Sequence, residues 1–386
     1  MVPLFAARDV EVAVSPERAI EAVREAFVAY ARGEWSMPPK VYVPAYPAGD
    51  FRAMPALGAG HAALKWVTSF PGNPELGLPT VMGLVLVSDA ANGVLKAVLD
   101  AGAVTALRTG AAAVLAAETL GRNDAGSAAV VGAGVNGRAA ARTFLARGCD
   151  VLIWDVDPAR SEAAATELGA GVAGTREEAL AADLVVTMTP GREVLFPPGS
   201  LRAGQHVSLM GADGPGKSEM AVEEVLRTHV FCDDWEQASH AGELMHAVER
   251  GLLKREQVTQ LGDVLAGTAP GRQSDAEITT FDSTGLAIQD LAVALAAIER
   301  ADELDLPTIS LGSSLVRRDR RDVRASSSHR CPGARSRARP RCRACRRRSS
   351  SRAERSGPGR RRTPAARSSG RSKRARTGPR PHRPVA

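Results

Sequence analysis

Residues 127–155 read SAAVVGAGVNGRAAARTFLARGCDVLIWD, and this stretch decides the fold class. Its apolar and polar pattern predicts a strand over 128–132, a helix over 137–147 and a second strand over 150–155. The pattern continues with a helix over 158–168 and with strands over 184–188, 206–210 and 229–232. Strands that alternate with helices in this way are typical of right-handed βαβ units in a doubly wound parallel sheet. The sequence therefore predicts an α/β fold that contains a Rossmann domain.

The turn between the first strand and the helix carries a complete GxGxxG motif, Gly132-Ala133-Gly134-Val135-Asn136-Gly137. The first glycine permits a tight turn, the second lets backbone N–H groups approach a pyrophosphate, and the third allows the helix to pack closely on the strand. The helix N-terminus adds the positive end of its dipole. Glycine-rich turns without a ligand also occur, but the strand before this motif and the helix after it favour a dinucleotide site.

An acidic residue follows at the spacing that such a site requires. Asp155 ends the second strand 18 residues after Gly137, where a carboxylate accepts hydrogen bonds from ribose hydroxyls. A carboxylate there repels a 2′-phosphate, so the sequence favours NAD over NADP, although the nearby Arg160 keeps NADP possible. We also assign the next two residues, Val156 and Asp157, to the cofactor site.

The chain on either side of this region has a different pattern of apolar and polar residues. Residues 15–32 predict an amphipathic helix, with Ser15 as its N-cap and Pro16 at the first helical position. Two long apolar helices are predicted over 105–120 and 284–303. Short β-type runs separated by Pro and Gly turns predict an antiparallel or mixed sheet with strands over 41–43, 63–68, 80–87 and 94–99. These elements predict a mixed α+β domain beside the Rossmann domain.

The charge of the chain is divided unevenly along its 386 residues. The whole chain has a net charge of +7, but residues 1–311 carry −16 and residues 312–386 carry +23. The first part is long enough to bury a sizeable core. It has no run of about 18 apolar residues, no signal-peptide pattern at its start, and only Cys149 and Cys232 as cysteines. We therefore expect a cytoplasmic protein that does not enter a membrane.

Residues 312–386 consist mainly of Arg, Ser, Pro and Gly and contain no aromatic residue, so we expect them to be disordered. An Arg-rich tail can bind nucleic acid through its phosphates. The tail also holds four residues of zinc-ligand type, His329, Cys331, Cys342 and Cys345. A third interpretation is a frameshift near Gly312, because GC-rich codons read out of frame yield mainly these residue types. We favour the frameshift, and we expect neither nucleic acid nor a metal as a partner.

Four charged residues interrupt apolar surroundings in the first part of the chain: Arg52, Lys65, Arg108 and Asp213. Lys65 lies within a β-type run, and Arg108 opens an almost wholly apolar predicted helix. Because Lys and Arg are rarely buried without a partner, such residues often line a cleft. They can also extend to solvent from the end of a strand or helix. Position in the sequence leaves both interpretations open.

Seven segments resemble, in order, the ornithine cyclodeaminase and μ-crystallin family. They are Lys65–Asn73, Gly77–Thr80, Arg108–Ala111, Gly132–Gly137, Thr187–Pro190, Gly211–Glu219 and Phe281–Ala287. The resemblance covers residues 1–311, and residues 211–219 and 281–290 look most like the archaeal-type alanine dehydrogenase branch. It implies a homodimer with NAD-dependent chemistry at the α-carbon of an amino acid or imine. It also implies a substrate-binding and dimerisation domain formed by residues 1–118 with 285–311, and an NAD-binding Rossmann domain over 119–284.

The same resemblance implies roles for individual residues. Arg52, Lys65 and Arg108 would hold the α-carboxylate of the substrate, since a carboxylate needs fixed cations. Lys65 and Asp213 would transfer protons, and crowding by the two arginines would lower the pKa of Lys65. Thr284 would contact the substrate. The cofactor would be contacted by Arg108, Thr189 and Ser283 in addition to the glycine motif.

The expected substrate follows from the lack of an acidic residue between Arg52 and Lys65. The family's ornithine enzymes are associated with a carboxylate between the positions of Arg52 and Lys65, but residues 53–64 contain no Asp or Glu. Burying a distal ammonium without a counter-charge costs on the order of several kcal/mol. We therefore expect oxidative deamination of L-alanine to pyruvate and ammonia. Cyclodeamination of ornithine to proline, reduction of a ketimine, and NAD(P)H binding without catalysis stay as alternatives.

Overall fold

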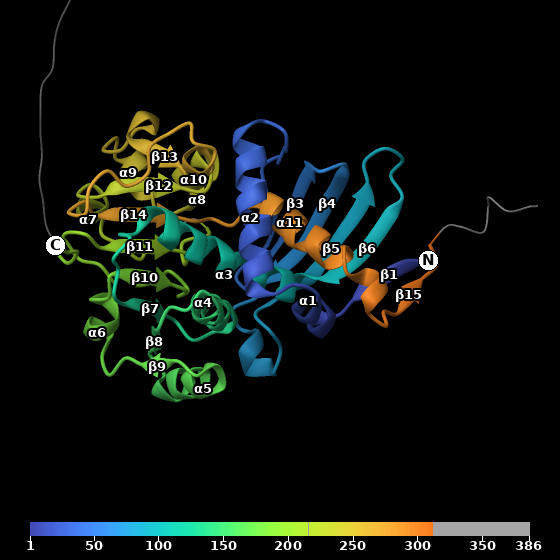
Figure 1. Cartoon of the computed structure of the whole chain (residues 1–386), viewed down its shortest axis with the longest axis horizontal. Coiled ribbons are helices and arrows are strands. Elements are labelled where there is room, and N and C mark those ends of the chain that lie inside the picture. Colours follow the sequence, from blue (N-terminus) through green and yellow to red (C-terminus); the bar gives the residue numbers. More distant parts are fainter. Residues whose placement is uncertain (215, 312–386) are drawn as a thin grey trace, which may run out of the picture. The chain divides into compact units, whose positions relative to one another are not determined.

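The computed structural model describes residues 1–214 and 216–311, which form two β-sheets with helices between and around them (Figure 1). One sheet is parallel and of Rossmann type, and the other is mixed, which confirms the predicted fold class. The domain boundaries given above, 1–118 with 285–311 and 119–284, stay a prediction. The predictions made for the Arg-rich tail fall outside the described residues.

The mixed sheet has seven strands in the order β15-β1-β6-β5-β4-β3-β2. Its strands are β1 (Val2–Phe5), β2 (Val41–Ala45), β3 (Gly49–Gly58), β4 (His61–Ser69), β5 (Val81–Asp89), β6 (Leu95–Asp100) and β15 (Thr308–Ile309). Strands β2 to β6 pair antiparallel in sequence order, while β1 pairs in parallel with β6 and antiparallel with β15. Segments from both ends of the described chain therefore build this sheet.

Four of these strands were predicted from short β-type runs, but the two short strands β1 and β15 and the long strand β3 were not. The sequence of β3 contains Pro55, which lacks a backbone N–H donor and is unfavourable inside a sheet. The structure resolves this conflict because β2 pairs with β3 only as far as Ala53. Pro55 therefore lies where β3 has no paired strand on its β2 side.

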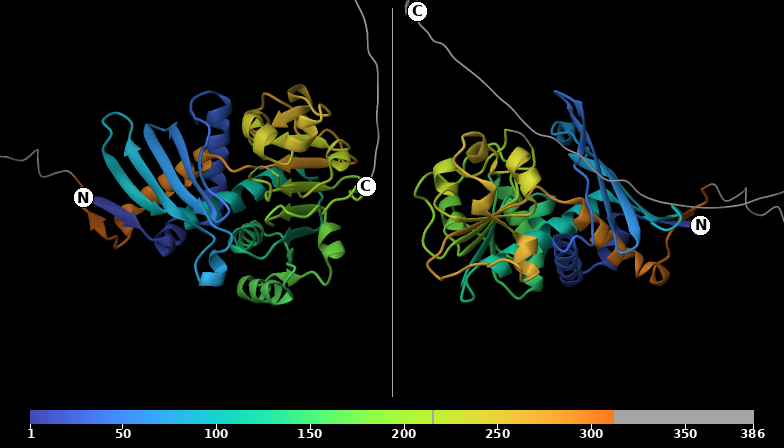
Figure 2. Two further views of the ribbon diagram at one scale, coloured as in Figure 1. Left: turned by 180° about the vertical axis from the view of Figure 1, so that it is seen from behind. Right: turned by 90° about the horizontal axis from the view of Figure 1, so that it is seen from above.

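Helices cover one face of the mixed sheet (Figure 2, right). They are α1 (Ala7–Ala13), α2 (Pro16–Ala31), α3 (Ala101–Leu120) and α11 (Ala287–Ile298). Helices α3 and α11 pack directly on the strands, and α1 and α2 pack against those two helices. Side chains on this face of the sheet are therefore held against α3 and α11.

The helix ends follow local capping chemistry. Helix α2 begins as predicted, and the Ser15 hydroxyl accepts the backbone N–H of Arg18 at 3.2 Å. Helix α3 begins four residues earlier than predicted because the Asp100 carboxylate accepts the N–H of Ala103 at 2.8 Å. The prediction of a helix over 284–303 was wrong at both ends. Gly285 has φ +75°, in the left-handed region, so α11 starts only after it.

The second sheet has eight parallel strands in the order β13-β12-β14-β11-β10-β7-β8-β9. They are β7 (Ala128–Val131), β8 (Val151–Trp154), β9 (Gly171–Val172), β10 (Leu184–Thr187), β11 (His206–Leu209), β12 (His229–Cys232), β13 (Val258–Gln260) and β14 (Thr279–Asp282). The direction of winding reverses between β7 and β10. In open α/β sheets, ligands bind at the carboxyl ends of the strands beside such a switch point.

Seven helices accompany the parallel sheet. They are α4 (Val135–Ala146), α5 (Pro158–Leu168), α6 (Arg176–Leu180), α7 (Val222–Val225), α8 (Trp235–Ala241), α9 (Met245–Glu249) and α10 (Leu261–Leu265). The strand–helix–strand unit predicted around the glycine motif is present, with each end within two residues of its predicted position.

Helix α3 joins the two sheets. It contacts β5 of the mixed sheet and β11 of the parallel sheet. Among the described residues it is also the one helix long and apolar enough to cross a membrane, by length and composition alone. Most of its surface is buried inside the protein, as is expected for the core helix of a globular domain.

We predict that Gly137→Ala destabilises the parallel sheet. A Cβ at Gly137 would lie 1.7 Å from the carbonyl oxygen of Gly132, so α4 would have to move away from β7. Overpacking of this kind typically costs about 1–3 kcal/mol, measurable as a lower urea midpoint. Gly134→Ala is the matched control, because a Cβ there meets no atom within 4 Å. Equal midpoints for the two variants would contradict the predicted close packing.

Candidate active site

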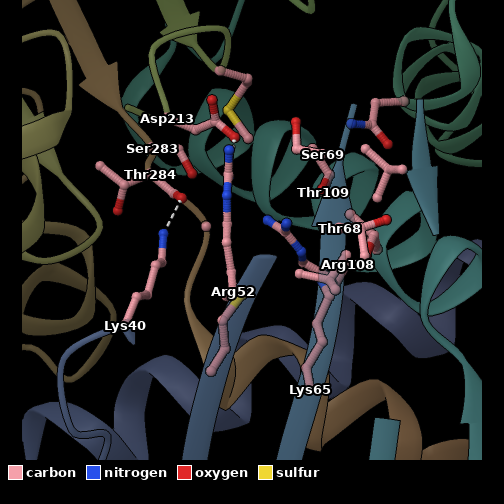
Figure 3. A pocket seen from close by; sticks show the side chains of 17 residues that line it. Lys40, Arg52, Lys65, Thr68, Ser69, Arg108, Thr109, Asp213, Ser283 and Thr284 are labelled. Atoms are coloured by element: carbon pink, nitrogen blue, oxygen red, sulfur yellow. Dashed lines mark hydrogen bonds and ion pairs between the residues drawn. The ribbon is translucent and has the colours of Figure 1, made fainter. Parts of the chain in front are cut away.

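A pocket of about 110 Å³ lies between the mixed sheet and the carboxyl edge of the parallel sheet (Figure 3). Strands β3, β4 and β5, helix α3, and the segments after β11 and β14 contribute to its walls. It brings together seven of the residues singled out from the sequence: Arg52, Lys65, Arg108, Asn136, Asp213, Ser283 and Thr284. These residues are up to 232 positions apart in the chain, so only the fold makes them neighbours.

Lys65 and Arg52 come from neighbouring strands. Lys65 pairs with Met54 in the β3–β4 register, so Arg52, two residues before Met54, projects from the same face. The Lys65 side chain is 2% exposed, and its ammonium donates to the Thr105 hydroxyl at 2.6 Å and to the Asp290 carboxylate at 2.9 Å.

The surroundings of Lys65 bring its pKa down toward neutral pH. Burial lowers its pKa to about 8, and repulsion by Arg108 and Arg52 acts in the same direction, while Asp290 opposes both. The side chain therefore exchanges a proton close to neutral pH, which a proton carrier in catalysis requires.

Arg108 lies in the second turn of α3 rather than at the start of the helix, and it is largely buried. Its Nη1 donates to the Gln289 side-chain oxygen at 3.4 Å, and its Nε is 3.5 Å from the Asp290 carboxylate. A Cβ at Gly285 would come within 2.5 Å of Nη1. The guanidinium thus lies against the backbone of the segment that precedes α11.

Asp213 connects the two sheets. One of its oxygens accepts from Arg52 Nη1 at 2.9 Å, and the other pairs with Lys217. Burial works against its charge, but Lys217 and Arg52 outweigh burial and hold the pKa of Asp213 well below its usual range. Arg52 also donates to Asp50 at 2.6 Å. Asp213 is therefore an ionised hydrogen-bond acceptor at neutral pH.

The structure adds Lys40, which sequence reasoning missed. Its ammonium donates to the backbone carbonyl of Thr284 at 2.6 Å and lines the same pocket (Figure 3). Burial lowers its pKa to about 8, although Asp233 and Asp213 act to raise it. The sequence signal was weak, since a lysine after Pro38-Pro39 at the start of a strand is usually a surface residue.

Asp233 is the second residue that the sequence did not reveal. It follows β12 and is buried, and its carboxylate accepts from the Ser283 hydroxyl at 3.1 Å and from the N–H groups of Thr284 and Gly285 at 2.8 Å. Burial raises its pKa to about 6, against the effect of Lys40. Asp233 thereby fixes the backbone turn that carries Ser283 and Thr284 into the pocket.

The glycine motif has a geometry that fits a dinucleotide. Gly132 has φ +110°, and a Cβ there would lie 2.6 Å from the Met188 carbonyl oxygen. Gly134 caps α4 without any side-chain hydrogen bond, and a Cβ at this position would meet open space. The backbone N–H groups of the first helical turn are therefore free to bind phosphate oxygens.

The remaining cofactor candidates lie along the same edge of the parallel sheet. The Asp155 carboxylate accepts the N–H of Ala133 at 2.7 Å and the N–H of Asp157 at 3.0 Å, which ties the end of β8 to the glycine loop. Val135 and Val156 are both exposed at this edge. The Thr189 hydroxyl lies outside the pocket and donates to Glu219 at 2.6 Å.

A glycine loop at the switch point of a parallel sheet, beside a pocket of cations, is typical of dinucleotide-dependent enzymes that act on carboxylates. The chain matches the model of the ornithine cyclodeaminase/mu-crystallin family over residues 3–304 and belongs to that family. Alanine dehydrogenase of Archaeoglobus fulgidus is 43% identical over 304 residues, which cover 76% of this chain and 93% of the relative.

Two solved structures share the fold over most of their length. An archaeal alanine dehydrogenase dimer with bound NAD has a TM-score of 0.76 and 40% identity, covering 80% of this chain and 99% of that chain. The Thermococcus litoralis Δ1-pyrroline-2-carboxylate reductase, in complex with NADH and L-proline, has a TM-score of 0.75 and 28% identity, covering 80% and 100%. These similarities confirm the family resemblance inferred from the sequence.

We predict that Asp155→Asn shifts the preference between cofactors toward NADPH. The substitution removes the negative charge that repels a 2′-phosphate but keeps an oxygen that can accept the Ala133 N–H. We expect the ratio of the Kd values for NADPH and NADH to fall about tenfold, or ~1.4 kcal/mol, in fluorescence titrations. Asp150→Asn, an exposed change just before the same strand, is the control. An unchanged ratio would remove Asp155 from the ribose site.

Proposed function

We propose that this protein is an NAD-dependent amino-acid dehydrogenase that converts L-alanine to pyruvate and ammonia, reversibly. The observation that carries the proposal is the placement of Lys65 and Arg108 in a small pocket beside the glycine loop, whose lining by described residues contains no free carboxylate. The cations suit an α-carboxylate. The absence of a free acid from the described lining disfavours a substrate with a second ammonium group.

Carboxylate binding is assigned mainly to Lys65 and Arg108. Both reach the pocket from the helix-covered side of the mixed sheet and share one acidic partner, Asp290. Arg52 forms ion pairs with Asp50 and Asp213, so its charge is largely compensated within the protein. Lys40 adds a further cation at the opposite wall, next to Thr284.

Proton transfer is assigned to Lys65, and the ordering of water to Asp213. Bound NAD would supply the acceptor for the hydride from the α-carbon. Because Lys65 has a pKa of about 8, it can accept a proton from the substrate amino group and return one as the product forms. Asp213 stays ionised, so it can accept a hydrogen bond from the attacking water and orient it toward the substrate carbon.

The size and charge of the pocket support a small side chain. Its volume of about 110 Å³ is below the ~150 Å³ of a protein cavity that holds benzene. Asp213 is the one acidic residue in the described lining, and Arg52 and Lys217 already pair with it. A distal ammonium such as that of ornithine would therefore lack a free counter-charge. The similarity to the Archaeoglobus alanine dehydrogenase supports the same choice.

The first test is NADH formation by the purified protein with L-alanine. We expect Lys65→Ala and Asp213→Ala each to lower kcat/KM at least ~100-fold, as is usual when a proton-transferring group is lost. Lys96→Ala and Asp302→Ala, both at exposed positions, are the matched controls and should keep full activity.

Other outcomes separate the alternatives. Proline release from ornithine without alanine oxidation would identify a cyclodeaminase, and NADH oxidation with a cyclic imine but not with pyruvate and ammonia would identify a ketimine reductase. Tight NADH binding with no turnover of any of these compounds would leave a non-catalytic binding protein. Full activity in both Lys65→Ala and Asp213→Ala would reject the assigned roles.

We also propose that two copies of the chain associate through the outer face of the mixed sheet. In the part of the chain that the structure describes, the helices pack on the opposite face, where Lys65 lies. Large apolar side chains are exposed on the outer face, among them Leu64, Trp66, Met82 and Leu84. Apolar patches of this kind usually mark association surfaces. The dimer described for the archaeal relative supports this assignment.

We predict that Leu84→Glu separates the dimer. Leu84 is 50% exposed and pairs with Trp66 across the β4–β5 register, so a carboxylate there would be buried against the partner without a counter-charge. Sedimentation velocity should show a dimer for the parent protein and a monomer for the variant. Val172→Glu, at an exposed apolar position on the parallel sheet, should stay dimeric. A dimer that survives Leu84→Glu would place the interface elsewhere.

A further inference from the structure

Asp290 lies behind the cationic wall of the pocket. It is the fourth residue of α11, and its side chain is 1% exposed. Its Oδ1 accepts from the Lys65 ammonium at 2.9 Å and is 3.5 Å from Arg108 Nε. Within residues 1–214 and 216–311, no other carboxylate lies within ion-pair distance of either cation. Asp290 does not line the pocket, so it can act on a ligand only through these two side chains.

Lys65, Arg108 and Asp290 together carry an excess of positive charge at the pocket wall. Lys65 and Arg108 are buried cations, and burying a charge without a partner is strongly unfavourable. A single carboxylate serves both, so the three side chains carry one excess positive charge when Lys65 is protonated. A ligand carboxylate would neutralise that excess, which makes the pocket selective for an anion.

Neighbouring residues of the same segment hold the arrangement in place. The Gln289 side-chain oxygen accepts from Arg108 Nη1 at 3.4 Å and from the Leu286 N–H at 3.2 Å. Gly285 leaves room for the guanidinium, where a Cβ would collide with it. Gln289 and Gly285 therefore orient Arg108, whereas the ammonium of Lys65 depends on Asp290 and on the Thr105 hydroxyl.

We propose that Asp290 is a positioning residue that holds the Lys65 ammonium and the Arg108 guanidinium at the pocket wall, where they can bind a carboxylate. Its effect on substrate affinity rests on the function proposed above. Its effect on Lys65 does not, because that effect is a property of the protein alone.

Three charged groups face Lys65, each from a different element: Asp290 from α11, Arg108 from α3 and Arg52 from β3. Asp290 acts to raise the pKa of Lys65, and the two arginines act to lower it. Asp290→Asn keeps the size and an accepting oxygen but removes the charge. The midpoint of Lys65 deprotonation should then fall below about 8, by roughly one pH unit or more.

The test is the pH dependence of lysine acetylation by trace acetic anhydride, read residue by residue by peptide mass spectrometry. The Lys65 midpoint should move down in Asp290→Asn. Lys40 is the internal control, because Asp233 and Asp213 are the acids that act on it, and its midpoint should not move. Glu299→Gln removes one negative charge from an exposed pair with Arg18 and should move neither lysine.

An unchanged Lys65 midpoint, or equal shifts of Lys65 and Lys40, would overturn the proposal.

In steady-state assays with L-alanine, Asp290→Asn should raise KM at least tenfold at pH 7.5 and change kcat less. A fall in kcat alone would count against a positioning role. An inactive parent protein would reject the proposed function, while the acetylation result would still decide the role of Asp290.

If Asp290→Asn does not fold, Lys65→Met in the same chain supplies the second test. The double variant no longer has the Lys65 ammonium that Asp290→Asn leaves without a carboxylate partner, so a cooperative unfolding transition should return. Failure of both Lys65→Met and Arg108→Met to restore it would show that Asp290 supports the fold through contacts other than these two cations, which also overturns the proposal.

Discussion

Two buried cations share one buried carboxylate where β4 of the mixed sheet meets α3 and α11. Lys65 lies 2.9 Å and Arg108 lies 3.5 Å from the same Asp290 oxygen. Burial of like charges is tolerated only when a partner is close and rigid, so β4, α3 and α11 must meet in one arrangement. These contacts hold α3 and α11 against the face of the mixed sheet that carries Lys65. They also explain why a segment near the end of the described chain is needed to complete a site that begins on β3 and β4.

Polar contacts then connect the mixed sheet to the parallel sheet around the pocket. Arg52 reaches Asp213, which follows β11, and Lys40 reaches the backbone of Thr284, which follows β14. Asp233 orders the segment after β14 by accepting hydrogen bonds from the N–H groups of Thr284 and Gly285. The walls of the pocket are thus charged groups from both sheets, and a change in the separation of the sheets would alter the distances on which binding depends. A hydride-transfer site needs its reacting groups to be held close together in a fixed geometry.

Much of the parallel sheet could be predicted because its signals are local. The GxGxxG turn, the apolar strands beside it and Asp155 all act within about 30 residues, and the strand and helix ends observed differ little from those expected. Strand β3 was missed because Pro55 contradicts its local propensity, and only the place where β2 stops makes that proline acceptable. The last helix was predicted to start too early because a single Gly285 in a left-handed conformation overrides the apolar pattern.

The residue types of the site were evident in the sequence, since Lys65 and Arg108 stand out in apolar runs. The residues that surround them in the fold were not evident, because Lys40, Asp233 and Asp290 look in the sequence like ordinary surface or helix residues. The amino-acid sequence by itself determined the fold class, the cofactor loop and the family. Tertiary structure alone decided which charges are buried together and therefore which lysines titrate near pH 8. The physical reason is that a pKa depends on desolvation and on charges a few ångströms away, and both are set by contacts between residues distant in the chain.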